Sequence, residues 1–453
     1  MAMQEFIDSL QSGENRNDTN IFYEYIAHPV LALVTWPMEK FVVPVIETAL
    51  YPAKPPLRYM LNEQVLERAI DLISFGEKNQ IMLYPTLVIT TGTGSLVGFT
   101  ARHKKLFGRN TERLVVSFSF FVNGNWKMRY RFSAKKIGGS KLNANIKILQ
   151  DNVKNKKIPP PQTGTMKYHS DTSWGISSEF NHPLFEEVDV VSGFHYRHRK
   201  FDAPPKGLAS ITCGDDGPFF ASDNCVDDRA LNTTFQDYSW SLGVDRNTVN
   251  NENIPTSGNH VNFWWMYHWV TDNRDFHEWE LTLKKYFFLG VERYEITPTE
   301  QREMGDLNFS KIKKTLKYHN LKKQIFNRKV IAAQLRVAQA YEVYEGRAPV
   351  YALHNLSNDT PMRGYSSSPF RDWTKVALCL EYRFPIIRLV EGTIFDEQGI
   401  VGENFNTFEL DQLKNSWGFG IRIARRDIFL CRGQLGFPGW GPPVINITVD
   451  TVF

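Results

Sequence analysis

Two nearby stretches decide the fold of this chain: Met362-Arg363-Gly364-Tyr365 and, a few residues later, Val376-Ala-Leu-Cys-Leu-Glu-Tyr-Arg-Phe-Pro385. The second stretch alternates apolar and polar residues with a period of two, which predicts a β-strand with one charged face. On that face lies Glu381. In the first stretch, Gly364 permits a tight loop tip that presents the Arg363 guanidinium. These features predict a strand with an inward carboxylate and a loop that carries one arginine.

The same alternation recurs along the chain and ends on an aromatic residue. Clear examples are residues 126–132, 330–341, 417–424 and 445–453. An aromatic stripe of Phe263, Trp265, Tyr267 and Trp269 occupies one face of another segment. A soluble β-sandwich would also carry charges on one face, but the stripe and the terminal Phe453 disfavour it. We therefore predict an all-β fold, a transmembrane antiparallel β-barrel.

Composition agrees with a large barrel and a small appendage. The chain has 453 residues, of which 13% are aromatic, and a mean hydropathy of −0.36. It contains no run of about 20 apolar residues, as a transmembrane helix requires, but transmembrane strands need only about 9–11 residues each. The net charge of +4 is too small to indicate nucleic-acid binding.

The first 80 residues differ from the remainder. Asn62 can cap a helix over Glu63–Phe75 that stops at Gly76, and several prolines interrupt the chain before it. We expect residues 1–80 to form a periplasmic, partly helical segment and residues 81–453 to form the barrel. No signal sequence is visible at the start, although an outer-membrane protein needs one, so it has been removed or the protein resides elsewhere.

The sequence contains no complete enzymatic motif, and we predict no catalytic residue, cofactor or metal. His195 and His198 lack the further ligands that zinc requires. By strand parity Cys379 and Cys431 lie on opposite faces and should not pair, whereas the pattern leaves the state of Cys213 and Cys225 open.

Five motifs in order resemble those of the BamA/TamA family, the bacterial surface antigens. They are Asp245-Arg246 followed by Pro255-Thr-Ser-Gly258, Met362-Arg363-Gly364-Tyr365, Glu381-Tyr-Arg-Phe-Pro385, Phe395-Asp396-Glu-Gln-Gly399, and Trp417-Gly-Phe-Gly420-Ile-Arg422. The resemblance implies 16 strands in the bacterial outer membrane. It also implies that the Arg363 loop folds into the lumen, where Arg363 meets Glu381 and Asp396 and Tyr365 packs on the wall.

The resemblance also suggests a function in protein assembly, insertion or translocation. Such barrels would use a weak seam between the first and last strands, and Pro85 lacks the N–H that pairing there requires. In the last strand, Ile445, Ile447, Val449 and Phe453 form the expected lipid-facing insertion signal.

Expected partners are outer-membrane lipids, client proteins and a periplasmic accessory protein. The accessory protein is expected because residues 1–80 show no POTRA module, the client-binding domain of the family. The alternative is a passive channel or structural barrel without client handling. The sequence leaves open the client and the role of the basic stretch at residues 294–328.

Overall fold

In the computed structural model, the chain divides into two units. One comprises Met60–Phe288 and Val330–Phe453, and the other comprises Met1–Tyr59 and Leu289–Lys329. The structure describes residues 73–76, 80–90, 94–106, 111–121, 124–158, 167–185, 187–202, 233–251, 254–289, 329–344, 349–356, 362–365, 370–387, 390–425 and 428–449. The expected helix up to residue 72, Cys213, Cys225, the stretch 294–328 and Phe453 lie outside these residues.

Within the described residues, sixteen strands form one sheet, to which the two-residue β1 (Ser74–Phe75) is added. The sixteen are β2 (Ile81–Thr90), β3 (Gly94–Lys104), β4 (Glu112–Phe121), β5 (Trp126–Ala134), β6 (Asn143–Ile158), β7 (Lys167–Phe185), β8 (Val188–Asp202), β9 (Thr233–Asn247), β10 (Gly258–Val270), β11 (Phe276–Phe288), β12 (Val330–Glu342), β15 (Thr374–Ile387), β16 (Val390–Gly402), β17 (Lys414–Arg425), β18 (Ile428–Pro438) and β19 (Val444–Val449).

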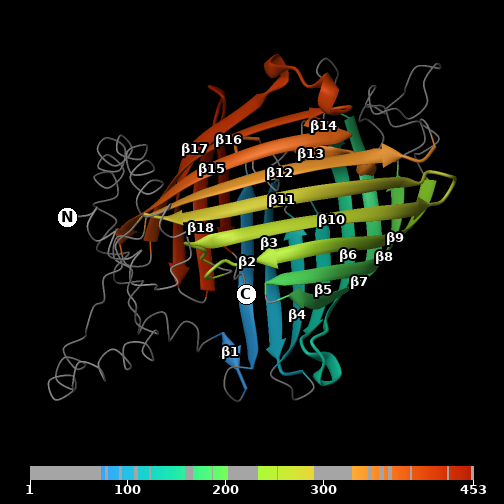
Figure 1. The fold of residues 1–453 in the computed structure, drawn as a ribbon, viewed down its shortest axis with the longest axis horizontal. Helices are drawn as coiled ribbons and strands as arrows, with labels where there is room; N and C mark the ends of the chain where they lie inside the picture. Colours follow the sequence, from blue (N-terminus) through green and yellow to red (C-terminus); the bar gives the residue numbers. More distant parts are fainter. Residues whose placement is uncertain are drawn as a thin grey trace, which may run out of the picture. The chain divides into compact units, whose positions relative to one another are not determined.

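The sheet closes on itself. Each strand pairs antiparallel with the next one along the chain, and β19 pairs with β2 (Figure 1). This is the predicted sixteen-strand antiparallel β-barrel. The order of strands is interrupted once, between β12 and β15, where β13 (His354–Leu356) and β14 (Phe370–Asp372) form a separate hairpin. No helix among the described residues is long and apolar enough to cross a membrane.

The alternation in the sequence separates the two faces of the barrel wall. On β10, Phe263 and Trp269 are exposed on the outer face. His268, which lies between them in the sequence, is buried on the inner face. The Tyr267 and Trp269 rings lie 4.8 Å apart on the outer face. On β15, Leu378 and Leu380 are exposed outward and Cys379 and Glu381 are buried inward. The outer surface is therefore apolar and aromatic, and charged residues gather inside.

The end of the expected N-terminal helix is a strand instead. Ser74 and Phe75 form β1, which pairs with Met82 and Ile81 of β2. Gly76, expected to stop a helix, directly follows β1 and has a φ of +80°. Tertiary pairing with a strand edge outweighs the local helical pattern here, because an isolated short helix is only marginally stable. The first barrel strand, β2, begins at Ile81, where the alternating pattern placed it.

Candidate functional site: the lumenal loop and the seam

The segment between β12 and β15 packs against the inner wall through a small apolar cluster. Leu356 and Met362 from this segment are fully buried against Ala377 of β15. Tyr365, Phe370 and Val401 pack around them. Gly399 on β16 makes room, because a Cβ there would lie 2.8 Å from Leu356 Cδ2. The cluster holds the loop tip, residues 362–365, inside the barrel.

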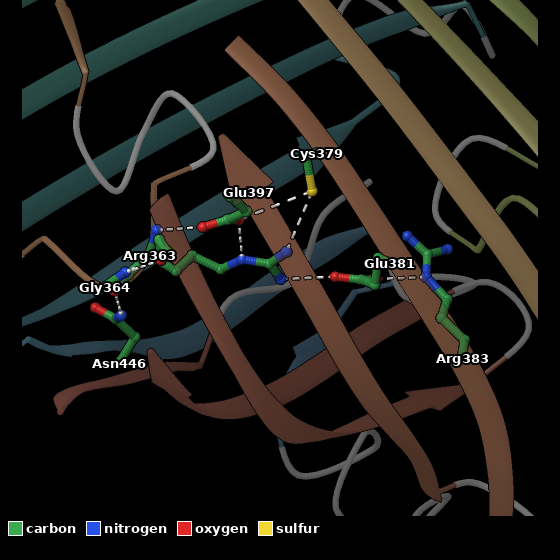
Figure 2. Close-up of polar contacts among 8 residues, drawn as sticks. Arg363, Gly364, Cys379, Glu381, Arg383, Glu397 and Asn446 are labelled. Atoms are coloured by element: carbon green, nitrogen blue, oxygen red, sulfur yellow. Dashed lines mark hydrogen bonds and ion pairs between the residues drawn. The ribbon is translucent and has the colours of Figure 1, made fainter. Parts of the chain in front are cut away.

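Arg363 at this tip binds two carboxylates from two strands (Figure 2). Its Nε donates to Glu397 Oε1 at 2.5 Å and its Nη1 donates to Glu381 Oε2 at 2.6 Å. The Arg363 backbone N–H also donates to Glu397 Oε2, at 2.6 Å. Glu397 is fully buried. Charge-assisted bonds from one guanidinium in several directions fix its orientation as well as its position.

Further contacts complete the surroundings of the guanidinium. It lies 3.6 Å from the centroid of the Phe395 ring, and its Nη2 lies 3.4 Å from Cys379 Sγ. Glu381 also accepts a bond from Arg383 Nε at 2.6 Å, so charges alternate along Glu397, Arg363, Glu381 and Arg383 (Figure 2). Burial lowers the pKa of Arg363, but the two carboxylates outweigh burial and hold it above its ordinary value.

The structure brings Arg363 and Glu381 together, as the resemblance implied, but it does not bring Asp396 to them. Asp396 instead accepts bonds from Asn415 Nδ2 at 3.0 Å and Gln398 Nε2 at 3.3 Å. Successive strand residues point to opposite faces, and Phe395 and Glu397 take the inner face of β16. Glu397 therefore occupies the role expected of Asp396.

Gly364 is needed because two backbones approach closely, and not for a left-handed conformation. A Cβ on Gly364 would lie 2.6 Å from the backbone carbon of Phe437, and one on Gly436 would lie 2.6 Å from that of Arg363. The Gly364 N–H donates to Ser416 Oγ at 2.7 Å. Glycines on both sides thus form the notch in which the tip lies.

The loop tip also reaches the last strands of the barrel. Tyr365 donates its hydroxyl proton to the Asn415 carbonyl on β17 at 3.2 Å and meets the Phe370 ring edge-on at 5.1 Å. Asn446 Nδ2, on β19, donates to the Arg363 carbonyl at 3.0 Å. The tip therefore contacts every strand from β15 to β19.

The seam between β2 and β19 is short over the described residues. The ladder joins Leu87–Thr90 to Asn446–Val449, whereas β2 pairs with β3 along its whole length. The β1 strand pairs with the same edge of β2, and Leu83 N donates to Ile73 O at 2.7 Å. Since backbone N–H groups alternate between the edges of a strand, the missing N–H of Pro85 belongs to this seam edge.

The predicted insertion signal is described only in part. Ile445 is 40% exposed on the outer face of β19, and Ile447 lies two residues further along the same face. Val449 is the last residue of β19. Phe453 lies outside the described residues.

Other chemistry is sparse in the described part of the chain. It holds no group of three or more His, Cys, Asp or Glu residues that could bind a metal ion. Cys379 is buried on the inner wall, Cys431 is half-buried, and both are free, in agreement with the parity prediction. The sequence assigned no role to Glu397, Phe395, Gly436 or Asn446, although the first two belong to a motif that resembles one of the family. Strand parity would have found Glu397, and no local pattern marks Gly436 or Asn446.

Comparison with known proteins identifies the family. The Omp85 superfamily domain matches residues 91–439, so the chain belongs to the Omp85 superfamily. The fold is similar to a BamA from Haemophilus ducreyi lacking POTRA domains 1–3, with a TM-score of 0.55 and 12% identity over 83% of this chain and 71% of that chain.

Two CdiB structures are also similar. CdiB from Acinetobacter baumannii has a TM-score of 0.48 and 10% identity over 82% of this chain and 60% of its own. CdiB from Escherichia coli has a TM-score of 0.49 and 10% identity over 83% of this chain and 63% of its own. A comparison with curated proteins found no match.

Proposed function

We propose that this barrel lies in the bacterial outer membrane and assists the assembly, insertion or translocation of other proteins there. Its partners would be outer-membrane lipids, client proteins and a periplasmic accessory protein. Two features together carry the proposal. The β2–β19 seam is short over the described residues, and a lumenal loop binds β19 through Asn446. Membership of the Omp85 superfamily and the apolar outer face support it.

The mechanism follows from the chemistry of strand edges. A strand edge that is not fully paired presents N–H and C=O groups that can template a strand of another chain. Over the described residues, four register pairs join β19 to β2, and Pro85 removes one donor from the seam edge. Over these residues, opening the seam breaks fewer bonds than opening the neighbouring β2–β3 ladder. The loop tip, anchored by Arg363, holds β19 in place between openings.

A disulfide across the seam tests this mechanism. Val88 and Thr448 are register partners, and partners in an antiparallel ladder lie about 4.5–5.5 Å apart, within disulfide range. The double variant Val88→Cys/Thr448→Cys would replace the depleted native protein in cells. We expect oxidation to lower the levels of other outer-membrane proteins as depletion does, and a reductant to restore them. Quantitative outer-membrane proteomics gives the measurement.

The matched control places the same bond in a fully paired part of the wall. Val190 and Val244 are partners in the β8–β9 ladder, so Val190→Cys/Val244→Cys should support normal protein levels when oxidised. The four single variants check for pairing with native cysteines. Full activity of the oxidised seam variant would rule out seam opening. An unchanged proteome after depletion itself would favour the alternative, a passive channel or structural barrel.

A further inference from the structure

A second region of the lumen carries a group of basic side chains on three consecutive strands. Register partners share a face, and on this basis six cations lie on the inner face of β3, β4 and β5. We call them the basic strip: Arg102, Lys104, Arg113, Lys127, Arg129 and Arg131. Arg129 and Arg131 are exposed to the lumen. The inner face of β2–β5 bears no Asp or Glu among the described residues of these strands.

Elsewhere on the inner wall, cations face acids. Lys147 lies 2.5 Å from Glu179, Lys375 lies 3.2 Å from Glu280, and Arg422 lies 3.3 Å from Glu391. Within the basic strip, Lys104 is the direct register partner of Arg113. On the β6 side, Arg131 faces Lys147 and Lys127 faces Asp151. Like charges directly opposite each other destabilise a sheet, so an anion bound beside Lys104 and Arg113 would stabilise this part of the wall.

The neutral residues between these cations suit an anionic ligand too. Several carry hydroxyl groups: Thr100 Oγ1 lies 3.1 Å from Thr86 Oγ1 and donates to Ser117 Oγ at 3.0 Å. Hydroxyls and basic side chains can both donate hydrogen bonds to carboxylate oxygens.

The strip follows the strands and does not form a ring around the barrel. On β5, Lys127, Arg129 and Arg131 are spaced two residues apart, or about 7 Å per step. The register places Arg102 level with Arg131, and Lys104 with Arg113 one step beyond. The cations thus span about 20 Å along the strands. A small anion would need one cluster, whereas this spacing suits a chain of negative charges in extended conformation.

We propose that the basic strip binds an acidic segment of an extended polypeptide in the lumen. This inference rests on the proposed function, because client handling is what brings an extended polypeptide to the barrel. The carboxylates of the segment would pair with Arg129 and Arg131, the two exposed cations of β5. Binding in water-filled surroundings is weakened by salt.

Fluorescence anisotropy of a fluorescein-labelled 20-residue glutamate peptide with the purified full-length barrel tests the proposal. We expect saturable binding at low salt that is lost in 0.5 M NaCl. Arg129→Gln/Arg131→Gln should weaken it by about two- to thirtyfold, the range for two exposed ion pairs. The control Lys135→Gln/Lys136→Gln removes the same charge from the exposed turn after β5 and should bind within about twofold of the native protein. The heat-dependent gel shift of folded barrels verifies that all proteins are folded.

Equal weakening by the two double variants, or no binding at low salt, would overturn the proposal. A tenfold preference for inorganic polyphosphate over the glutamate peptide would also overturn it, since the strip would then suit phosphate polymers better. The outcome of this binding test is independent of the seam-disulfide experiment. The peptide would still bind to a barrel whose seam plays no part in client handling.

Discussion

The inner walls formed by β15–β19 and by β3–β5 differ in how they use charge. On the first, Arg363 from the loop is bound by Glu381 and Glu397, and glycines make room for the loop tip. On the second, the described inner face carries cations alone. A wall whose charges are satisfied by its own chain is a docking surface for that chain. A wall whose strands carry cations and no acidic residues on their inner face is suited to an anionic ligand from outside.

Arg363→Ala should have the largest effect on the docking of the loop. It leaves two buried carboxylates without their shared cation, which costs about 3–5 kcal/mol of loop-docking free energy. We expect the loop to undock and proteinase K to cleave it much faster, in intact cells and in liposomes. Unchanged cleavage would mean that Arg363 does not hold the loop.

Glu397→Gln should have the next largest effect. Replacing the fully buried carboxylate by an amide weakens two charge-assisted bonds to Arg363, and bonds of this kind are worth about 1.5–3 kcal/mol. The neighbouring Asp396→Asn lies on the other face and should change docking by less than about 0.5 kcal/mol. The same cleavage assay compares them, and an equal effect of the two variants would contradict the assignment of faces.

Gly436→Ala tests the notch that receives the loop tip. Its methyl group would overlap the Arg363 backbone, and overpacking of this kind costs about 1–3 kcal/mol. Gly433→Ala is the matched control on β18, because nothing lies within 4 Å of a Cβ at that position. Accelerated cleavage in the Gly436 variant alone is the expected result. Identical cleavage rates would show that the loop tip does not require the notch.

Asn446→Ala should have the smallest effect. It removes one neutral hydrogen bond to the Arg363 carbonyl, worth about 0.5–1.5 kcal/mol. Hydrogen exchange of β19 amides should rise slightly, because the loop no longer helps to hold the last strand. If exchange in β19 does not respond while loop cleavage does, the loop does not stabilise the seam.

The fold was predictable because alternation is a strong and repeated signal. The period-two pattern of β15 and β19, the aromatic stripe of β10 and the family motifs agreed on one architecture. The inward face of Glu381 was also predictable from strand parity, whereas its pairing with Arg363 was implied by the family resemblance. Contacts between distant segments were not predictable, and Asn446 with Arg363 is the clearest example.

Two predictions were wrong, the role of Asp396 and the helix that was expected to extend to Phe75, and both have local explanations. At Phe395-Asp396-Glu397, adjacent carboxylates point to opposite faces, so a motif carried over without strand parity selects the wrong one. An aromatic residue on the inner face, where Phe395 lies against the guanidinium, hides the usual alternation. At Ser74–Phe75, a helical pattern continues to the end of the segment, but these two residues pair with the edge of β2 instead.

The central claim is that Arg363 docks the loop through Glu397, and a double-mutant cycle tests it most directly. The free energy of loop opening, measured by proteolysis in liposomes, would be compared for Arg363→Ala, Glu397→Ala and the double variant. We predict a coupling energy above about 1.5 kcal/mol, as found for close charged pairs. The parallel cycle with Asp396→Ala should be additive to within about 0.5 kcal/mol. Additive behaviour with Glu397, or equal coupling to Asp396, would contradict the account.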